Sequence, residues 1–308
     1  MSHASETFHE GEVSVQHATG EQDVADQNAP MIADAVVGGA RLFLHAQRML
    51  VVASRDARGS LWASILFGRG GFAAADDGGQ SVTIDRSMLF ENETDVLQAN
   101  LKVKEPLGLL AIDLATRRRL RINGRVVSLT HEQIVVRVEE SYPNCPKYIQ
   151  RRRLRSVTRR DNATIPPVRE GQSPDAAFLA AVKKADTLFV ASGHPSRGLD
   201  ASHRGGLPGF IRILAPGLFR IPDYAGNSIF NTLGNLSVDR RCGLTFPDFE
   251  TGRIFQSTGE AALHLNAPRN DDSADTGRYW DFQVQHWRSS ELPVQADWEF
   301  VDYSPYNP

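Results

Sequence analysis

The sequence predicts a mainly β protein with some helix (β+α), in which two tandem barrels pack as a pseudo-dimer within one chain. Three observations lead to this fold class: one internal repeat of domain length, about six short β-rich runs in each copy, and two helical patterns in each copy. The chain has 308 residues, of which 41% are hydrophobic, so it is long enough and apolar enough to build two cores.

The internal repeat is visible in two ungapped windows. Residues 50–72 and 188–210 are identical at 10 of 23 positions, and residues 100–124 and 235–259 are identical at 9 of 25. A period of this length is too long for a solenoid repeat and matches a whole domain. We therefore expect a duplication whose two units pack like the subunits of a homodimer, with a ligand site at their interface.

The predicted organisation has three parts. An N-terminal segment covers residues 1–30, a first barrel with its connector covers 31–160, and a second barrel covers 161–308. The first 30 residues are polar, and both a disordered tail and an ordered segment are open for them.

Each unit is expected to begin with a helix and continue with short strands. Apolar residues recur at helical spacing from Ile32 to Met49, and Ser173 before Pro174 is typical of a helix N-cap in the second unit. Shorter helices are expected over 95–101 and 228–236. The expected strands lie at 49–53, 61–67, 108–114, 119–128 and 133–139, and at 187–191, 199–204, 211–214, 218–221, 243–246, 254–263 and 279–287.

The composition excludes several classes of protein. Lys and Arg number 34 against 37 Asp and Glu, so the basic excess of a nucleic-acid coat is missing. Two cysteines, Cys145 and Cys242, are too few for a disulfide scaffold or a four-cysteine zinc site, and they fit a reducing compartment. The sequence has neither a long apolar run nor a secretory signal pattern. We expect a cytoplasmic protein with no nucleic-acid partner and no membrane partner.

Four segments carry a resemblance to a known family. They are Phe8–Glu12, Asn144–Gln150, Asp200–Gly206 and Phe230–Leu236. With the duplication, they make the chain similar to the pyridoxamine 5'-phosphate oxidase-like FMN-binding split-barrel proteins, and above all to their long two-barrel members. The resemblance implies two tandem FMN-binding split β-barrels, FMN as the cofactor in the groove between them, and an oxidoreductase acting on a small-molecule substrate. NADH or NADPH is the candidate electron donor, and whether two chains pair as a homodimer is left open.

The resemblance also implies the cofactor-binding residues. In the family one strand runs along the flavin ring, and it resembles Ser202–Gly206 here, so Arg204 is the expected flavin contact. The family usually holds the phosphate with a Ser-Arg-Lys cluster after a hairpin, where this chain reads Asp223–Asn227 and lacks the basic pair. No catalytic residue and no metal site are predicted. The expected cofactor-binding residues are Ser202, His203, Arg204, Asp223, Asn227, Asn231 and Lys147.

Two features of the predicted site have alternative readings. Asn231 and Asn235 lie one turn apart and either face the cofactor together with Asn227, or Asn227 caps the helix and Asn235 ends it; the pairing of Asn235 with Asn100 in the other copy favours a fold role for Asn235. The missing positive charge could come from Arg117, Arg119 and Arg121, which alternation places on one face, and a solvated face is the competing reading. Cys145 is expected to be a buried structural cysteine.

The two copies differ where a site would differ. Asp200, His203 and Arg204 of the second copy align with Trp62, Ile65 and Leu66 of the first. We therefore expect one competent flavin site per chain, built mainly from the second unit. A binding or scaffold module without turnover remains an alternative function, as does heme or deazaflavin in the same groove.

Overall fold

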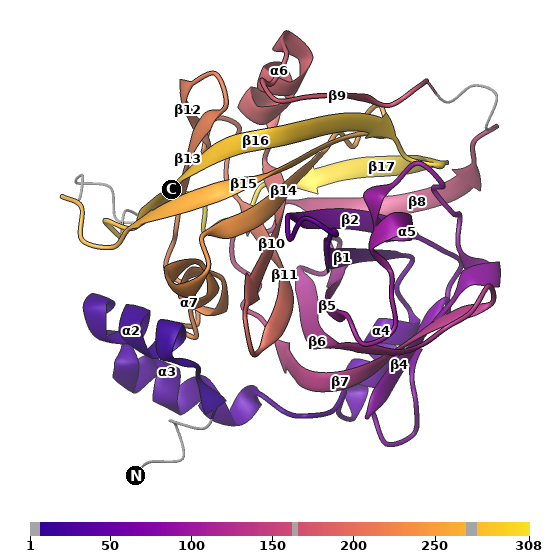
Figure 1. Cartoon of the computed structure of the whole chain (residues 1–308), viewed down its shortest axis with the longest axis horizontal. Helices are drawn as coiled ribbons and strands as arrows, with labels where there is room; N and C mark the ends of the chain where they lie inside the picture. The colour runs from indigo at the N-terminus through magenta and orange to yellow at the C-terminus, as the bar shows by residue number, and fades with distance from the viewer. Residues whose placement is uncertain (1–6, 162–165, 269–275) are drawn as a thin grey trace.

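A computed structural model describes residues 7–161, 166–268 and 276–308 of the chain, and within them antiparallel strands predominate (Figure 1). The first large sheet has the order β2-β1-β5-β6-β7-β4-β3. Its strands are β1 (Met49–Arg55), β2 (Leu61–Phe67), β3 (Ala73–Ala75), β4 (Ser81–Asp85), β5 (Pro106–Asp113), β6 (Arg118–Leu129) and β7 (Gln133–Pro143).

The second large sheet has the order β11-β10-β14-β15-β16-β13-β12, with β9 (Arg169–Gly171) added to β16. Its other strands are β10 (Thr187–His194), β11 (Gly198–Gly205), β12 (Arg212–Ala215), β13 (Leu218–Pro222), β14 (Arg241–Pro247), β15 (Arg253–His264) and β16 (Tyr279–Glu291). A separate ribbon pairs β8 (Arg151–Arg159) with β17 (Val294–Asp302).

Short helices flank these sheets. They are α2 (Glu10–Thr19), α3 (Gln22–Asn28), α4 (Gly39–His45), α5 (Val96–Asn100), α6 (Ala176–Lys184) and α7 (Asn231–Val238), with 3-10 turns η1 (Ala29–Met31) and η2 (Arg86–Met88). Over the described residues, none of the helices combines the length and apolarity needed to cross a membrane.

The two large sheets share one strand order and one register. Val52 pairs with Leu109 in the first sheet, and the aligned residues Val190 and Leu244 pair in the second. The aligned long hairpins also carry a register shift at the same place, at Asn123/Gly124 and at Thr258/Gly259. The prediction of a mainly β protein is confirmed, and the strands of both sheets pair antiparallel. Each sheet is an open path of strands in the described structure, and two tandem barrels remain a prediction.

Three large apolar cores and one small apolar cluster hold the described part of the fold together. One lies within the first sheet and includes Leu109 and Ile122, and a second lies within the second sheet and includes Phe178 and Phe246. The third contains side chains from both sheets, such as Val51 and Phe189, so burial of apolar surface stabilises the pairing of the two halves.

The close contact between the sheets requires glycine at two equivalent positions. A Cβ atom placed on Gly108 would lie 2.6 Å from the backbone of Asp200, and one placed on Gly243 would lie 2.4 Å from the carbonyl oxygen of Leu61. These distances are far inside van der Waals contact. Backbone therefore packs against backbone at both places, and no larger residue fits without movement of a strand.

Several expected elements differ in the structure. From residue 7 onward the N-terminal segment is mostly helical, so the disordered-tail alternative is wrong for these residues, and residues 1–6 lie outside the described residues. The His9 side chain and Glu12 form a capping box for α2, and Gly20 ends it at φ 70°. The helix expected from Ile32 is only the seven residues of α4. Asp175 rather than Ser173 caps α6, because its side chain accepts the Phe178 amide hydrogen bond. The β8–β17 ribbon was not predicted.

Candidate functional site

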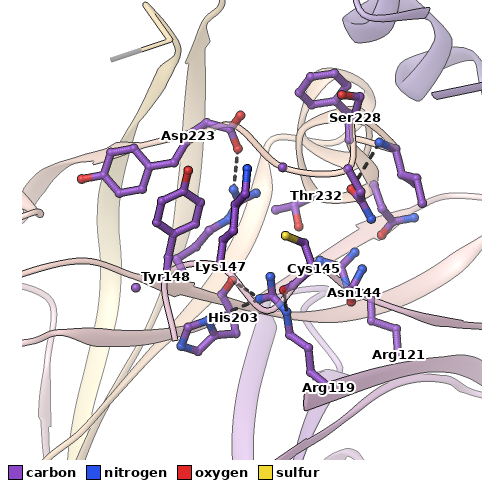
Figure 2. A pocket seen from close by; sticks show the side chains of 18 of the residues that line it. Arg119, Arg121, Asn144, Cys145, Lys147, Tyr148, His203, Asp223, Ser228 and Thr232 are labelled. Carbon is purple, nitrogen blue, oxygen red and sulfur yellow. Dashed lines mark hydrogen bonds and ion pairs between the residues drawn. The ribbon is translucent and has the colours of Figure 1, made fainter. Parts of the chain in front are cut away.

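A pocket lies at the seam between the two halves of the chain (Figure 2). Strand β6 of the first sheet and the connector after β7 form one wall, and β11 with the segment from Pro222 to Thr232 forms the other. The pocket has an open mouth and a cavity volume of about 90 Å³, well below the roughly 300–1,000 Å³ of typical ligand sites. In the described structure it is therefore a narrow slot.

The structure brings the predicted site residues together. Six of the seven line the pocket: Lys147, His203, Arg204, Asp223, Asn227 and Asn231. Ser202 lies behind the wall, where its hydroxyl accepts a 3.0 Å hydrogen bond from Thr232. Sequence reasoning missed other lining residues, among them Tyr142, Asn144, Tyr148, Phe210 and Ser228. Asn144 and Tyr148 could have been found from the sequence, because the segment Asn144–Gln150 is one of the four that carry the family resemblance. Only Lys147 of this segment was included in the predicted set.

Arg204 occupies the second-unit wall and is held by a carboxylate. Its guanidinium forms an ion pair with Asp223, whose other oxygen accepts a 3.1 Å hydrogen bond from Nε of Arg278. Asp223 and Arg278 are both buried. Asp223 therefore positions two arginines and does not itself supply a free negative charge to the pocket.

The first unit adds two arginines from β6. Arg121 is buried and lies 3.3 Å from a carboxylate oxygen of Asp200, and it donates to the Tyr142 hydroxyl at 3.2 Å. Arg119 is half-buried and donates to the carbonyl oxygens of Cys145 and His203. The solvated-face reading is therefore wrong for these two arginines. Arg117 does not line the pocket, but it is not fully solvated either, because it is half-buried and forms an ion pair with Asp302.

Arg119 is a half-buried cation whose charged neighbours are mostly positive. Burial, together with the nearby charges of Arg121 and Arg204, lowers the pKa of Arg119 to about 9. Among the described residues Arg119 has no carboxylate within ion-pair distance, and the same holds for Lys147. An enclosed cation without a counter-ion is unfavourable, and an anionic ligand in the pocket would relieve that cost.

His203 is a neutral lining residue. Burial and the charges of Arg119 and Arg204 hold the pKa of His203 well below its usual value. Its Nδ1 atom lies 3.3 Å from an Arg119 nitrogen that can only donate, so Nδ1 accepts and the proton sits on Nε2. Within the part of the chain that is described, Nε2 has no hydrogen-bond partner, and neither has Oδ1 of Asn144. Lining residues thus include buried polar atoms without a partner, among them also Nε of Arg121 and Nε of Arg204.

Cys145 differs from its expectation. It is half-buried and lines the pocket rather than packing in a core, and Figure 2 shows its sulfur facing the cavity. Cys242, by contrast, is fully buried.

Two tyrosines and the C-terminal tail border the slot. The rings of Tyr148 and Tyr224 lie 4.9 Å apart between centroids, and the Lys147 ammonium lies 5.4 Å from the ring centroid of Tyr306. The Ser304 hydroxyl accepts the Tyr148 amide hydrogen bond at 3.1 Å. The last residues of the chain therefore help to fix the connector side of the pocket.

The asparagines of the α7 region have distinct roles. Asn235 is buried and donates to Ser192, and the aligned residue Asn100 donates to Ser54, both at 3.0 Å. This repeated bond gives Asn235 the fold role that was favoured. Asn231 lines the pocket but donates to the buried carboxyl of Glu12. Asn227 does not cap α7, whose N-cap position is Phe230.

The equivalent seam on the other side is filled by side chains. Leu66 takes the place of Arg204 and is buried, and Gln256 takes the place of Arg121. Gln256 donates to the Ala63 carbonyl oxygen at 2.8 Å, and the Ser64 hydroxyl donates to buried Asp95. This second seam thus pairs part of its polar groups internally, although Oε1 of Gln256 has no partner among the described residues, and one site per chain stays a prediction.

Two histidines that lie close together at the start of α2 and the end of β10 do not offer nitrogen ligands to a metal. Atoms of His9, Glu10 and His194 lie within 4.8 Å of one another. Nδ1 of His9 accepts from the Gly11 amide, and Nδ1 of His194 accepts from the amides of Ser196 and Arg197. Both Nε2 atoms therefore carry protons, and neither has a lone pair for a cation.

Comparisons with known proteins give a partial likeness. No family model matches the chain, and no curated protein matches it. Among solved structures, a protein provisionally assigned as a pyridoxamine 5'-phosphate oxidase from Lactobacillus delbrueckii aligns with a TM-score of 0.31 and 8% identity, over 38% of this chain and 98% of that one. HutZ, a heme storage protein from Vibrio cholerae, aligns with a TM-score of 0.26 and 9% identity, over 43% and 98%.

A third solved structure, a variant of HupZ from Group A Streptococcus, aligns with a TM-score of 0.31 and 10% identity, over 37% of this chain and 96% of that one. Each match spans less than half of this chain at a low score. The likeness therefore assigns neither a cofactor nor a reaction to this protein.

Proposed function

We propose that the protein binds FMN in the seam pocket and is a flavin-dependent oxidoreductase acting on a small molecule. The observation that carries the proposal is the charge of the pocket. Its lining includes four cations, Arg119, Arg121, Arg204 and Lys147, and the carboxylates of Asp200 and Asp223 pair with only two of them. The remaining excess of two positive charges matches a phosphate monoester, which carries about −1.5 to −2 at neutral pH.

The remaining lining suits the other parts of FMN. Arg119 and Lys147 would hold the phosphate, since arginine forks and lysine ammonium groups both bind phosphate oxygens. The open acceptor of Asn144 and the side chain of Asn227 suit ribityl hydroxyls. The aromatic rings of Tyr148, Tyr224 and Phe210 suit a flat ring system. The slot is narrow, so entry of the ring requires Tyr148 and Tyr224 to move apart.

When bound, FMN supplies the redox chemistry, with NADH or NADPH as the proposed electron donor. The residues of this chain bind it, orient it and surround it with positive charge. Neutral His203 would donate through its free Nε2 hydrogen and is not placed as a general base.

The finer architecture belongs to the same proposal. We take the two sheets as the products of a tandem duplication, each the core of one split barrel, with one flavin per chain. Their common strand order, their common register and the filled second seam support this. Both walls of the pocket come from one chain, so the proposal does not need a homodimer.

The deciding experiment is the absorbance spectrum of purified protein, followed by titration with FMN. Flavin bands and saturation at one FMN per chain would support the proposal, whereas an intense heme Soret band or failure to bind FMN would contradict it. Anaerobic mixing with NADH and then NADPH separates an oxidoreductase from a binding module, because only the former bleaches the flavin.

A further inference from the structure

Backbone strain is concentrated at the seam pocket. The described residues include five non-glycine residues with positive φ, and three of them line the pocket: Tyr148 at 65°, Ser228 at 58° and Phe230 at 61°. Such a conformation is unfavourable for a residue with a side chain and persists only where surrounding contacts impose it. Two of the three lie in the short turn 227–231, which forms the outer wall of the pocket and leads into α7.

The N-terminal helices hold this turn in place. The Gln16 side chain donates a hydrogen bond of 3.3 Å to the backbone carbonyl oxygen of Ile229. The Asn28 side chain donates one of 2.9 Å to the backbone carbonyl oxygen of Asn227. The Ser228 hydroxyl donates to the Glu21 carboxylate between α2 and α3. Helices α2 and α3 therefore contact three consecutive residues of the turn, and Figure 1 shows them beside α7.

Glu21 also connects to the arginine that lines the pocket. Its carboxylate forms an ion pair with Arg278, Arg278 donates to Asp223, and Asp223 forms an ion pair with Arg204. The Arg278 guanidinium also lies 5.1 Å from the ring centroid of Phe230, the second strained residue of the turn. Alternating charges thus run without a gap from the N-terminal helices to the pocket.

The docking of α2 is close and specific. A Cβ atom on Gly11 would lie 2.2 Å from the carbonyl oxygen of Gly234 in α7, and one on Gly234 would lie 2.5 Å from the Glu12 side chain. The two helices approach at a point where neither tolerates a side chain. Their relative position, and with it the position of Glu21, is fixed by this contact.

We propose that α2 and α3 are a built-in part of the ligand site and that Glu21 is a positioning residue, which holds the 227–231 turn and orients Arg204 through Arg278 and Asp223. The effect on FMN affinity rests on the proposed function, whereas the effect on the turn does not. Glu21 touches no ligand under this proposal and acts through other residues.

The test compares Glu21→Ala with Asp26→Ala in the full chain. Asp26 is an exposed acidic residue of α3, the helix that begins directly after Glu21, so its replacement removes an equal charge close by in the chain. We expect Glu21→Ala to speed hydrogen exchange of the amides in 227–231 at least tenfold and to weaken FMN binding by about tenfold, while the melting temperature stays close to that of Asp26→Ala. Glu21→Gln keeps an oxygen that accepts from Ser228 but loses the negative charge that pairs with Arg278. Its exchange rate and its FMN affinity should therefore lie between those of Glu21→Ala and Asp26→Ala.

The outcomes separate the two proposals. Faster exchange with weaker FMN binding supports both, and faster exchange in a protein whose wild type binds no FMN supports the positioning role and refutes the proposed function. Equal exchange in Glu21→Ala and Asp26→Ala overturns the positioning role whatever FMN does. If Glu21→Ala does not fold, Asn28→Ala removes only the contact with Asn227 and is read by the same exchange measurement.

Discussion

Replacement of Arg119 by Gln tests the charge argument most directly. Arg119 lines the pocket without a carboxylate partner in the described structure, so the proposed phosphate is its counter-ion. A charge-assisted hydrogen bond contributes about 1.5–3 kcal/mol. Loss of that contribution predicts FMN binding that is about 10- to 150-fold weaker, because about 1.4 kcal/mol corresponds to a factor of ten.

Riboflavin provides the internal comparison for this variant. It has the ring and the ribityl chain of FMN but no phosphate, so Arg119→Gln should change its affinity little. Quenching of flavin fluorescence in parallel titrations with FMN and riboflavin measures the ratio of the two dissociation constants. We expect a wild-type preference for FMN that largely disappears in Arg119→Gln and is partly kept in Arg119→Lys.

Arg118→Gln is the matched control, because Arg118 is the adjacent residue on β6, is exposed and lies over the Phe43 ring instead. The melting temperature of each variant must be followed as well, since Arg119 also binds the carbonyl oxygens of Cys145 and His203. Equal losses of FMN and riboflavin affinity, or an undiminished preference for FMN in Arg119→Gln, would refute the assignment of the phosphate to Arg119.

Three further predictions concern stability. Burial raises the pKa of Glu12 from 4.5 to about 8, so the folded protein keeps a proton that the unfolded chain has released, and stability falls as the pH rises from about 4.5 to about 8. Glu12→Gln should therefore flatten the fall in melting temperature between pH 6.5 and pH 8, a window above the titration of His9, whose pKa burial lowers from 6.5 to about 4. Gly243→Ala should lower the free energy of unfolding by about 1–3 kcal/mol in urea titrations, because its Cβ would overlap the Leu61 carbonyl, whereas Gly70→Ala, which meets no atom within 4 Å, should have little effect. Asn235→Ala should destabilise more than Asn100→Ala, because Asn235 holds both Ser192 and His9 while Asn100 holds Ser54, and equal melting temperatures would contradict this.

The sequence predicted the strands well where one residue pattern dominates. The buried runs of β1, β2 and β10 are largely apolar and are bounded by turns, and the repeat identified β11, which is more polar, as the counterpart of β2. The β8–β17 ribbon could not be found this way, because β8 is largely exposed and rich in arginine, and its pairing with the C-terminus joins distant segments. Its register depends on ion pairs such as that of Arg151 with Asp302, which local periodicity does not encode.

The candidate site was predictable only in part for a similar reason. His203 and Arg204 could be named because they replace apolar residues of the other copy, a difference visible in the sequence. Arg119 was an open alternative, since alternation places it on a face but does not say whether that face meets water or the second sheet. The part of α2 and α3 could not be foreseen, because their contacts with the 227–231 turn cross about 200 residues of chain.

The two seams show how one backbone can take two roles. Their strands agree in order and register, so the difference lies in side chains: one seam holds Leu66 and Gln256, and the other holds Arg204 and Arg121 at the same positions. Buried apolar side chains and the hydrogen bond of Gln256 stabilise the seam that holds Leu66 without any ligand. The seam that holds Arg204 is the pocket, and it encloses more positive than negative charge, which destabilises the unliganded protein. A seam of that kind would be less stable than its counterpart unless an anion occupies it, so the ligand that binds there should also raise the melting temperature of the whole chain.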